Sequence, residues 1–233
     1  MDKTSKVLDH RNLMLWEEMN KHYTIQLQSS PEPNYIVNFK EDLITIYVDE
    51  NNLNPASFTH ELLHIYLKYK GILIADDYTT RVFDTLHLSV FFKKELRDYI
   101  GNCLEHNVMY SLFLDLGFDK KSFIADYKKP KLTVEEARNI QVQYRSSGGY
   151  NLDAIDAFIG KFFGAKSCKN SDLNYSRSYK ILEQTDKKLY KLLCDFWDDW
   201  TTFDMNNPED SYSEILDYHF EDLLSWQEGK KIS

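Results

Sequence analysis

Two short runs rich in β-branched and aromatic residues stand out near the start of a chain whose pattern is otherwise helical. These runs, residues 35–39 and 43–49, flank the charged segment 40–42, which is typical of a β-hairpin. Residues 24–28 would add a third strand. The pattern therefore predicts a small sheet of two to four strands.

A helix with a well-defined start is expected soon after this sheet. The side chain of Asn54 can accept a hydrogen bond from one of the free N–H groups of the first turn. Pro55 suits the first helical position because no N–H is needed there. The helical pattern continues as far as Gly71, where we expect the helix to end.

Most of the remaining chain reads as helix. Only 8 glycines and 5 prolines interrupt the 233 residues, and so few breakers are typical of a helix-rich chain. Helices are expected over 78–100 and 100–117, with a stop at Gly117. A further helix is expected where Thr133 and Glu136 form the capping-box pattern.

The last third of the chain carries leucine and aromatic side chains spaced three and four residues apart. We favour a helix face that packs on a core over a groove for a partner. The face consists of Tyr179, Leu182, Leu189, Leu192, Leu193, Phe196, Trp197 and Trp200, and then Ile215, Tyr218, Leu223, Leu224 and Trp226. No linker isolates this part, so we expect one mostly helical α+β domain over 1–233. Its core would span about 20–125 and its helical extension about 130–233.

His60, Glu61 and His64 form an HExxH motif inside the helix expected from Asn54. With 3.6 residues per turn, the two histidines project from one face, and both imidazoles can reach one metal ion. Glu61 lies close enough to act on a water molecule at the metal without binding the metal itself. Two histidines satisfied within a core, with no metal, are the alternative interpretation.

The motif and the order of the elements around it resemble the zincin metallopeptidases, and most of all the compact ImmA/IrrE-type branch. The resemblance covers about residues 35–115: a short hairpin, the HExxH helix and a later helix with a carboxylate. It implies a zinc-dependent peptidase in which His60 and His64 bind Zn²⁺ and Glu61 is the general base. It also implies that Leu43 to Val48 form the sheet edge to which an extended peptide substrate adds.

A catalytic zinc site needs a third protein ligand, which the resemblance places on a helix further along the chain. Glu105 is the candidate, because Glu105 and Asn107 are similar to the Glu-Ala-Asn segment that carries this ligand in the ImmA/IrrE-type proteins. His106 is the second candidate, since an imidazole also binds zinc well and two neighbouring residues cannot both face the ion. His87, Asp84 and Glu95 are weaker candidates for the same position.

The net charge and the cysteine content limit the kinds of partner and the cellular compartment that we expect. Lys and Arg total 28 against 37 Asp and Glu, and this net charge of −9 argues against nucleic acid as a partner. We find neither a signal peptide nor an apolar run that would span a membrane. Cysteines are odd in number and widely separated, which is typical of a reducing compartment. We therefore expect a cytoplasmic protein that acts on a protein or peptide substrate.

Two functions of different classes follow from these features. The first is zinc-dependent hydrolysis of peptide bonds. The second is a catalytically inactive zincin-fold interaction or sensor protein, in which the helices of 176–227 bind a partner. Glu61 discriminates between them, because a structural zinc site has no use for a carboxylate beside an open coordination position. Hydrolysis of a non-peptide substrate by the same chemistry is a third possibility.

Overall fold

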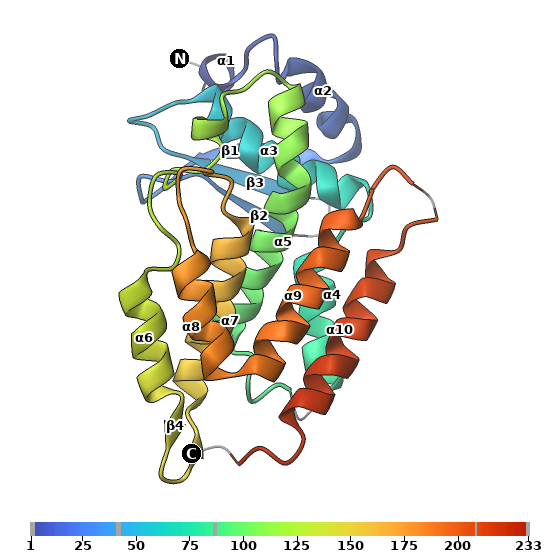
Figure 1. The fold of residues 1–233 in the computed structure, drawn as a ribbon. Coiled ribbons are helices and arrows are strands. Elements are labelled where there is room, and N and C mark those ends of the chain that lie inside the picture. Colours follow the sequence, from blue (N-terminus) through green and yellow to red (C-terminus); the bar gives the residue numbers. More distant parts are fainter. Residues whose placement is uncertain (1–2, 41–42, 86–87, 208, 232–233) are drawn as a thin grey trace. The chain divides into compact units, whose positions relative to one another are not determined.

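The computed structural model describes residues 3–40, 43–85, 88–207 and 209–231, and the chain divides into two compact units (Figure 1). The first unit comprises Met1–Leu73 and Val108–Lys128, and the second comprises Ile74–Asn107 and Lys129–Ser233. The mostly helical α+β class is confirmed. Residues 74–107 share a unit with the C-terminal helices, whereas the sequence placed them with the core. The single domain over 1–233 stays a prediction.

The first unit is built on a three-stranded sheet in the order β1-β3-β2. β1 (Thr24–Ser29) runs parallel to β3 (Leu43–Val48), and β2 (Ile36–Lys40) runs antiparallel to it, so the hairpin and the third strand are confirmed. The expectation that Leu43–Val48 forms an edge is wrong, because β1 pairs with the side of β3 that the hairpin leaves open. The outer strands of the described sheet are β1 and β2.

β3 is central because it is the most apolar of the three strands. Its Ile44, Ile46 and Val48 are fully buried, whereas every residue of β1 and β2 that the structure describes keeps some exposure. The three side chains belong to one hydrophobic cluster with Phe58, Leu62 and Ile65. This cluster anchors the helix that carries the HExxH motif to the sheet.

α3 (Pro55–Tyr69) is the HExxH helix, and it begins and ends as the sequence predicts. The Asn54 side chain accepts a hydrogen bond from the backbone N–H of Ala56 at 2.8 Å, and Pro55 takes the first helical position. Just beyond the helix, Gly71 has a φ of +74°, a left-handed conformation that favours glycine. The remaining helices that begin in this unit are α1 (Thr4–Val7), α2 (Leu13–His22) and the short η1 (Lys120–Ser122).

Helices make up most of the second unit. α5 (Lys94–Asp115) starts in this unit and continues into the first. The other elements are α4 (Ile74–Asp84), α6 (Val134–Gln143), β4 (Arg145–Ser146), β5 (Gly149–Tyr150), α7 (Leu152–Ser167), α8 (Ser176–Thr185), α9 (Lys187–Thr202) and α10 (Tyr212–Gln227). The predicted capping box of Thr133 and Glu136 is present at the start of α6. Among the described residues, no helix combines the length and the apolar character needed to cross a membrane.

The two helices predicted over 78–100 and 100–117 are wrong in their boundaries. α4 ends at Asp84, and one helix, α5, then covers Lys94–Asp115. Residues 88–91 form a turn, and the side chains of Leu88, Phe91 and Phe92 are buried. An apolar run that the sequence assigned to a helix therefore belongs to a buried turn.

Gly101 lies inside α5 and does not end a helix. A Cβ atom at this position would lie 2.6 Å from the Cβ of Ala75 in α4. Real Cβ atoms do not approach each other so closely, so glycine at 101 allows α4 and α5 to pack together. The glycine serves a close approach between helices, not a break in the chain.

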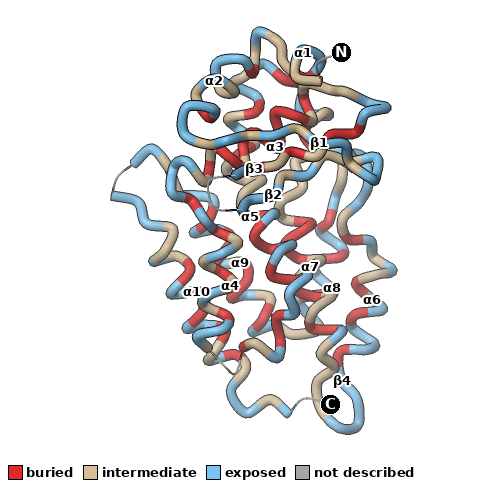
Figure 2. The backbone as a smooth tube through the Cα atoms, turned by 180° about the vertical axis from the view of Figure 1, so that it is seen from behind, coloured by how far each residue is buried: buried red, intermediate tan, exposed pale blue. Residues whose placement is uncertain are grey.

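Most of the face predicted for the last third of the chain lies in the core (Figure 2), while Tyr179, Ile215 and Leu224 are half-buried. Its buried members in α8 and α9 are Leu182, Leu189, Leu192, Leu193, Phe196, Trp197 and Trp200. In α10 the prediction holds for Leu223 and Trp226 but is wrong for Tyr218, which is 66% exposed. The buried positions of the first turns of α10 are instead Leu216, His219 and Phe220. Leu216 and His219 each follow a predicted position by one residue, so the buried face at the start of α10 is displaced by about one residue from the predicted face.

His219 of α10 is a polar side chain in this apolar core. Only 2% of it is exposed, its ring stacks on Phe196 at 3.9 Å, and its Nε2 lies 3.2 Å from the hydroxyl of Tyr78. Burial lowers the pKa of His219 to about 3, from an ordinary value of 6.5. The folded protein therefore keeps this imidazole neutral.

We predict that His219 makes the protein sensitive to acid. Between pH 6.5 and about 3 the unfolded chain binds a proton at this position that the folded chain does not. Because of this one histidine, the free energy of unfolding should therefore fall by about 1.4 kcal/mol for each unit by which the pH is lowered. Urea unfolding at pH 6, 5 and 4, followed by tryptophan fluorescence, measures the slope.

His219→Gln should remove this part of the slope, because glutamine does not titrate. Tyr78→Phe is the matched control: it deletes the hydroxyl beside the imidazole but leaves the buried histidine, so the slope should remain. Equal pH slopes for the wild type and His219→Gln would contradict the assignment.

Candidate metal centre

Three histidines come together at the HExxH helix. His60 and His64 lie one turn apart on α3, with their ring centroids 5.2 Å apart, and His106 joins them from α5. One nitrogen from each ring lies within 4.8 Å of the other two. His106 lies in α5, two residues before the part of that helix that belongs to the first unit.

Glu105, the third ligand proposed from the sequence, is not in this group. Neighbouring residues of a helix point about 100° apart, so Glu105 and His106 cannot both face the same point. Asp84 and Glu95, the weaker candidates, are also not in the group, and His87 lies outside the described residues. Glu105 as a ligand stays a prediction, and the arrangement favours His106 in its place.

The hydrophobic pattern of α5 does not separate the two candidates. Met109 and Phe113 are fully buried, and they follow His106 by three and seven residues and Glu105 by four and eight. Both sets of spacings share one face of a helix. The resemblance of Glu105 and Asn107 to a family segment was therefore what favoured Glu105, and we find no signal in the sequence that singles out His106.

His60 is held in the form that a metal ion requires. The pKa of His60 is lowered to about 3, mainly by burial and also by the nearby His64, while a hydrogen bond to the backbone of Phe123 acts in the opposite direction. The imidazole is therefore neutral at neutral pH, as a metal-binding histidine must be. A hydrogen bond from the second ring nitrogen to a backbone carbonyl is also the usual way in which such a ligand is oriented.

Glu61 is a nearly buried carboxyl group beside these imidazoles, with 9% of the residue exposed. Burial raises its pKa, while the neighbouring His64 and a hydrogen bond from the backbone of Val37 in β2 work against that rise. A carboxyl group with a raised pKa is better matched to proton transfer near neutral pH than one in water. Glu61 thus has the environment expected of a general base.

The three imidazoles suit zinc. Zinc binds histidine nitrogens at about 2.1 Å with tetrahedral geometry, which places two ligand nitrogens about 3.4 Å apart. The nitrogens here lie within 4.8 Å of one another, which is close enough for them to be candidates for one ion. Three histidines also leave one tetrahedral position open, as catalytic zinc sites do. The donor set therefore fits the metal that the sequence suggested.

A pocket of about 200 Å³ opens beside His60 and Glu61. All of its walls come from the first unit: residues 33–35 ahead of β2, Asp49 and Asn52 after β3, Ser57 in the first turn of α3, and residues 122–125. Phe123 closes one side, with its ring 4.9 Å from that of His60. The pocket gives a small ligand access to the candidate base and to one candidate metal ligand.

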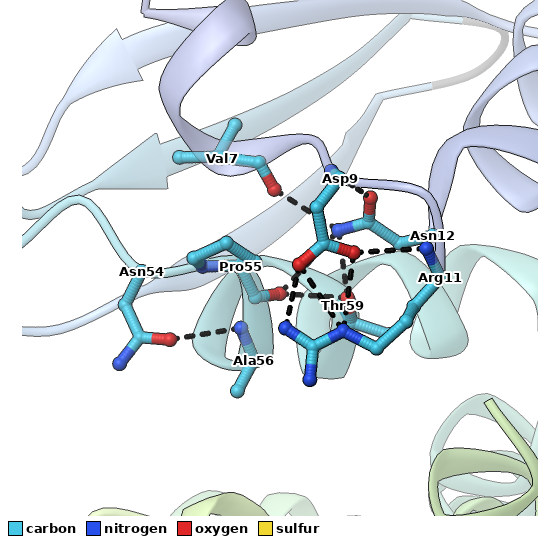
Figure 3. A network of polar contacts seen from close by, with 8 residues as sticks. All are labelled: Val7, Asp9, Arg11, Asn12, Asn54, Pro55, Ala56 and Thr59. Atoms are coloured by element: carbon cyan, nitrogen blue, oxygen red, sulfur yellow. Dashed lines mark hydrogen bonds and ion pairs between the residues drawn. The ribbon is translucent and has the colours of Figure 1, made fainter. Parts of the chain in front are cut away.

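A buried network of polar contacts fixes the start of α3, as Figure 3 shows. The amide nitrogen of Asn12 donates to the carbonyl of Val7 at 3.0 Å and to the hydroxyl of Thr59 at 2.9 Å. The Asn12 amide oxygen accepts from the backbone N–H of Asp9 at 2.9 Å. Because Thr59 directly precedes His60, this network helps to hold the HExxH turn in place.

We predict that Asn12→Ala lowers the free energy of unfolding by about 3 kcal/mol, because it leaves several buried polar groups without partners. Asn12 itself is fully buried. Asn20→Ala is the matched control: this exposed amide also donates to a backbone carbonyl, that of Trp16, but water can replace it. Its effect should stay below about 1 kcal/mol. If urea unfolding shows that the two variants lose the same free energy of unfolding, the role given to Asn12 is contradicted.

Comparisons with protein-family models, with curated proteins and with solved structures give no match for this chain.

Proposed function

We propose that this protein is a zinc-dependent metallopeptidase, with His60, His64 and His106 as the zinc ligands and Glu61 as the general base. The observation that carries the proposal is the grouping of three histidine nitrogens within 4.8 Å of one another, with Glu61 next to His60 on the same helix. The pocket beside Glu61 supports it further, because a substrate needs access to the base.

Zinc, when bound, lowers the pKa of a water molecule and polarises a substrate carbonyl group. Glu61 accepts the proton of the attacking water at its carboxylate and then donates this proton to the nitrogen of the leaving amine. Its buried position favours this cycle, since the raised pKa stabilises the protonated form between the two transfers. The hydrogen bond from the backbone of Val37 keeps the carboxylate in a fixed orientation.

The second candidate is a catalytically inactive protein of the same architecture. It would bind zinc, or no metal, and act through its C-terminal helices. The buried carboxyl group of Glu61 favours the peptidase. Burial raises the pKa of this group and destabilises its charged form, which lowers the stability of the fold. A purely structural metal site has no use for such a group.

The substrate of the proposed peptidase is a protein or peptide. We place the reaction in the cytoplasm, because the three cysteines, Cys103, Cys168 and Cys194, form no disulfide in the described structure.

The experiment that tests the proposal is cleavage of a library of unstructured peptides by the zinc-loaded protein, followed by mass spectrometry. We expect cleavage that a chelator abolishes and added Zn²⁺ restores. A folded, zinc-loaded protein that cleaves none of the peptides would contradict the peptidase and favour the inactive protein.

A further inference from the structure

The pocket beside Glu61 has a definite charge. Two carboxyl groups, Asp49 and Glu61, line it, and no Lys or Arg is among the described residues of its wall. The imidazole of His60, which the proposed function assigns to the metal, also lines the wall. Asp49 is not one of the proposed metal ligands, so its carboxylate is the group of this wall that can pair with a cation in the pocket.

Asp49 is the carboxyl group of this wall that has no place in the proposed chemistry. It directly follows β3, and only 8% of it is exposed. Its Oδ1 accepts a hydrogen bond from the backbone N–H of Asn51 at 2.9 Å, which stabilises the turn after the strand. Its Oδ2 accepts no hydrogen bond from any residue that the structure describes. This oxygen is therefore available to accept a hydrogen bond from a cation in the pocket.

The neighbour of Asp49 in the wall is Tyr35. Its hydroxyl donates to the carbonyl of Asn52 at 3.0 Å and accepts from the N–H of Asn54 at 2.9 Å. Burial raises the pKa of Tyr35, a hydrogen bond from Asn54 opposes this, and the negative charge of Asp49 adds to the rise. Tyr35 is therefore a neutral, fixed part of the wall that leaves the Asp49 charge uncompensated.

We infer that this pocket binds the positively charged side chain of an Arg or Lys residue of the peptide substrate, and that Asp49 is the residue that selects it. The inference rests on the proposed function and adds the substrate class to it. At about 200 Å³ the pocket is smaller than the sites that hold drug-sized molecules, so it takes a single side chain. Pairing with a guanidinium or ammonium group would give the Oδ2 of Asp49 its partner.

The test measures binding, so that it does not depend on cleavage. Fluorescein-labelled peptides that carry one arginine, with the N-terminus acetylated, are titrated with the Glu61→Gln protein by fluorescence anisotropy. The matched peptides carry citrulline, which has the shape of arginine without its charge. In the Glu61→Gln background, Asp49 is the one carboxyl group left among the described residues of the wall. We expect the arginine peptide to bind about 10-fold more tightly than the citrulline peptide.

Asp49→Asn in the same background should reduce this preference to less than about 3-fold, because asparagine keeps the Oδ1 that stabilises the turn but loses the charge. Asp115→Asn is the matched control: Asp115 is an exposed residue at the end of α5 and does not line the pocket. This variant should keep the full preference. Melting temperatures of the variants show whether each one folds, and the comparison of arginine with citrulline holds without the Asp49 variant.

Equal binding of arginine and citrulline peptides would overturn the inference, and cleavage of neutral peptides by the wild type would still leave the peptidase in place. Binding that requires a free N-terminus would assign the cation to the N-terminal amine and overturn the choice of a side chain. Binding of none of the peptides would overturn it as well. A preference for arginine without any cleavage would support the pocket and contradict the peptidase.

Discussion

Glu61→Gln is expected to lower kcat for peptide cleavage by about 1000-fold, while the protein keeps its zinc. Glutamine has nearly the same shape and can still accept the hydrogen bond from the backbone of Val37, but it cannot take up a proton. General bases contribute about 100-fold to 10,000-fold to rates, and the buried position of Glu61 excludes most of the water that could replace it. Steady-state kinetics on one cleaved peptide, together with the zinc content of the variant, measure both effects.

Glu61→Gln should also have an effect on the melting temperature that differs from the effect expected if Glu61 only stabilised the fold. Burial raises the pKa of Glu61, so its ionised form is disfavoured in the folded protein. At neutral pH the neutral amide should leave the melting temperature unchanged or raise it. Glu18→Gln in α2 is the matched control. This exposed carboxylate pairs with Lys21 and His22, and its loss should leave kcat unchanged. A Glu61→Gln protein with more than a tenth of wild-type activity would contradict the general-base role.

His106→Ala is expected to weaken zinc binding by more than about 100-fold. Loss of a group that only orients a ligand costs about 10-fold to 100-fold in affinity, and loss of a ligand costs more. The variant removes one of the three nitrogens that the structure brings within 4.8 Å of one another. Competition with a zinc-binding dye at neutral pH gives the dissociation constant.

Glu105→Ala is the matched control for this prediction, because it truncates the neighbouring side chain on the same helix. Glu105 is not in the group of three, so its loss should change zinc affinity by less than about 3-fold. The reverse result, with a large effect for Glu105 and a small one for His106, would restore the ligand set expected from the sequence.

Local signals predicted the part of the fold that carries the motif. The boundaries of α3 follow from Asn54, Pro55 and Gly71, each of which acts on the backbone at its own position. The hairpin of β2 and β3 likewise follows from two apolar runs around a charged turn. Such features need no knowledge of the rest of the chain, so a single sequence contains them.

The predictions that failed depend on contacts between segments that are distant in the sequence. Whether Leu43–Val48 is central or at an edge depends on the pairing with β1. The boundary expected at residue 100 falls inside α5, next to Gly101, which allows the close approach of Ala75. These contacts are set by packing, which the hydrophobic pattern alone does not specify.

In the candidate site, too, some residues could be predicted from local spacing and one could not. His60, Glu61 and His64 lie on one helix, and their spacing alone places them together. The choice between Glu105 and His106 depends on how α5 is rotated about its axis, a difference of about 100° per residue. In the structure a nitrogen of His106 lies within 4.8 Å of a nitrogen of each of the other two histidines, whereas Glu105 is not in that group.

The most direct test of the central claim is the zinc content of the protein purified without chelator and without added metal. Elemental analysis of the wild type is compared with that of the His60→Ala/His64→Ala double variant. We expect about one zinc ion per wild-type chain and none in the double variant. A folded wild type that contains no zinc and does not bind added Zn²⁺ would contradict the account.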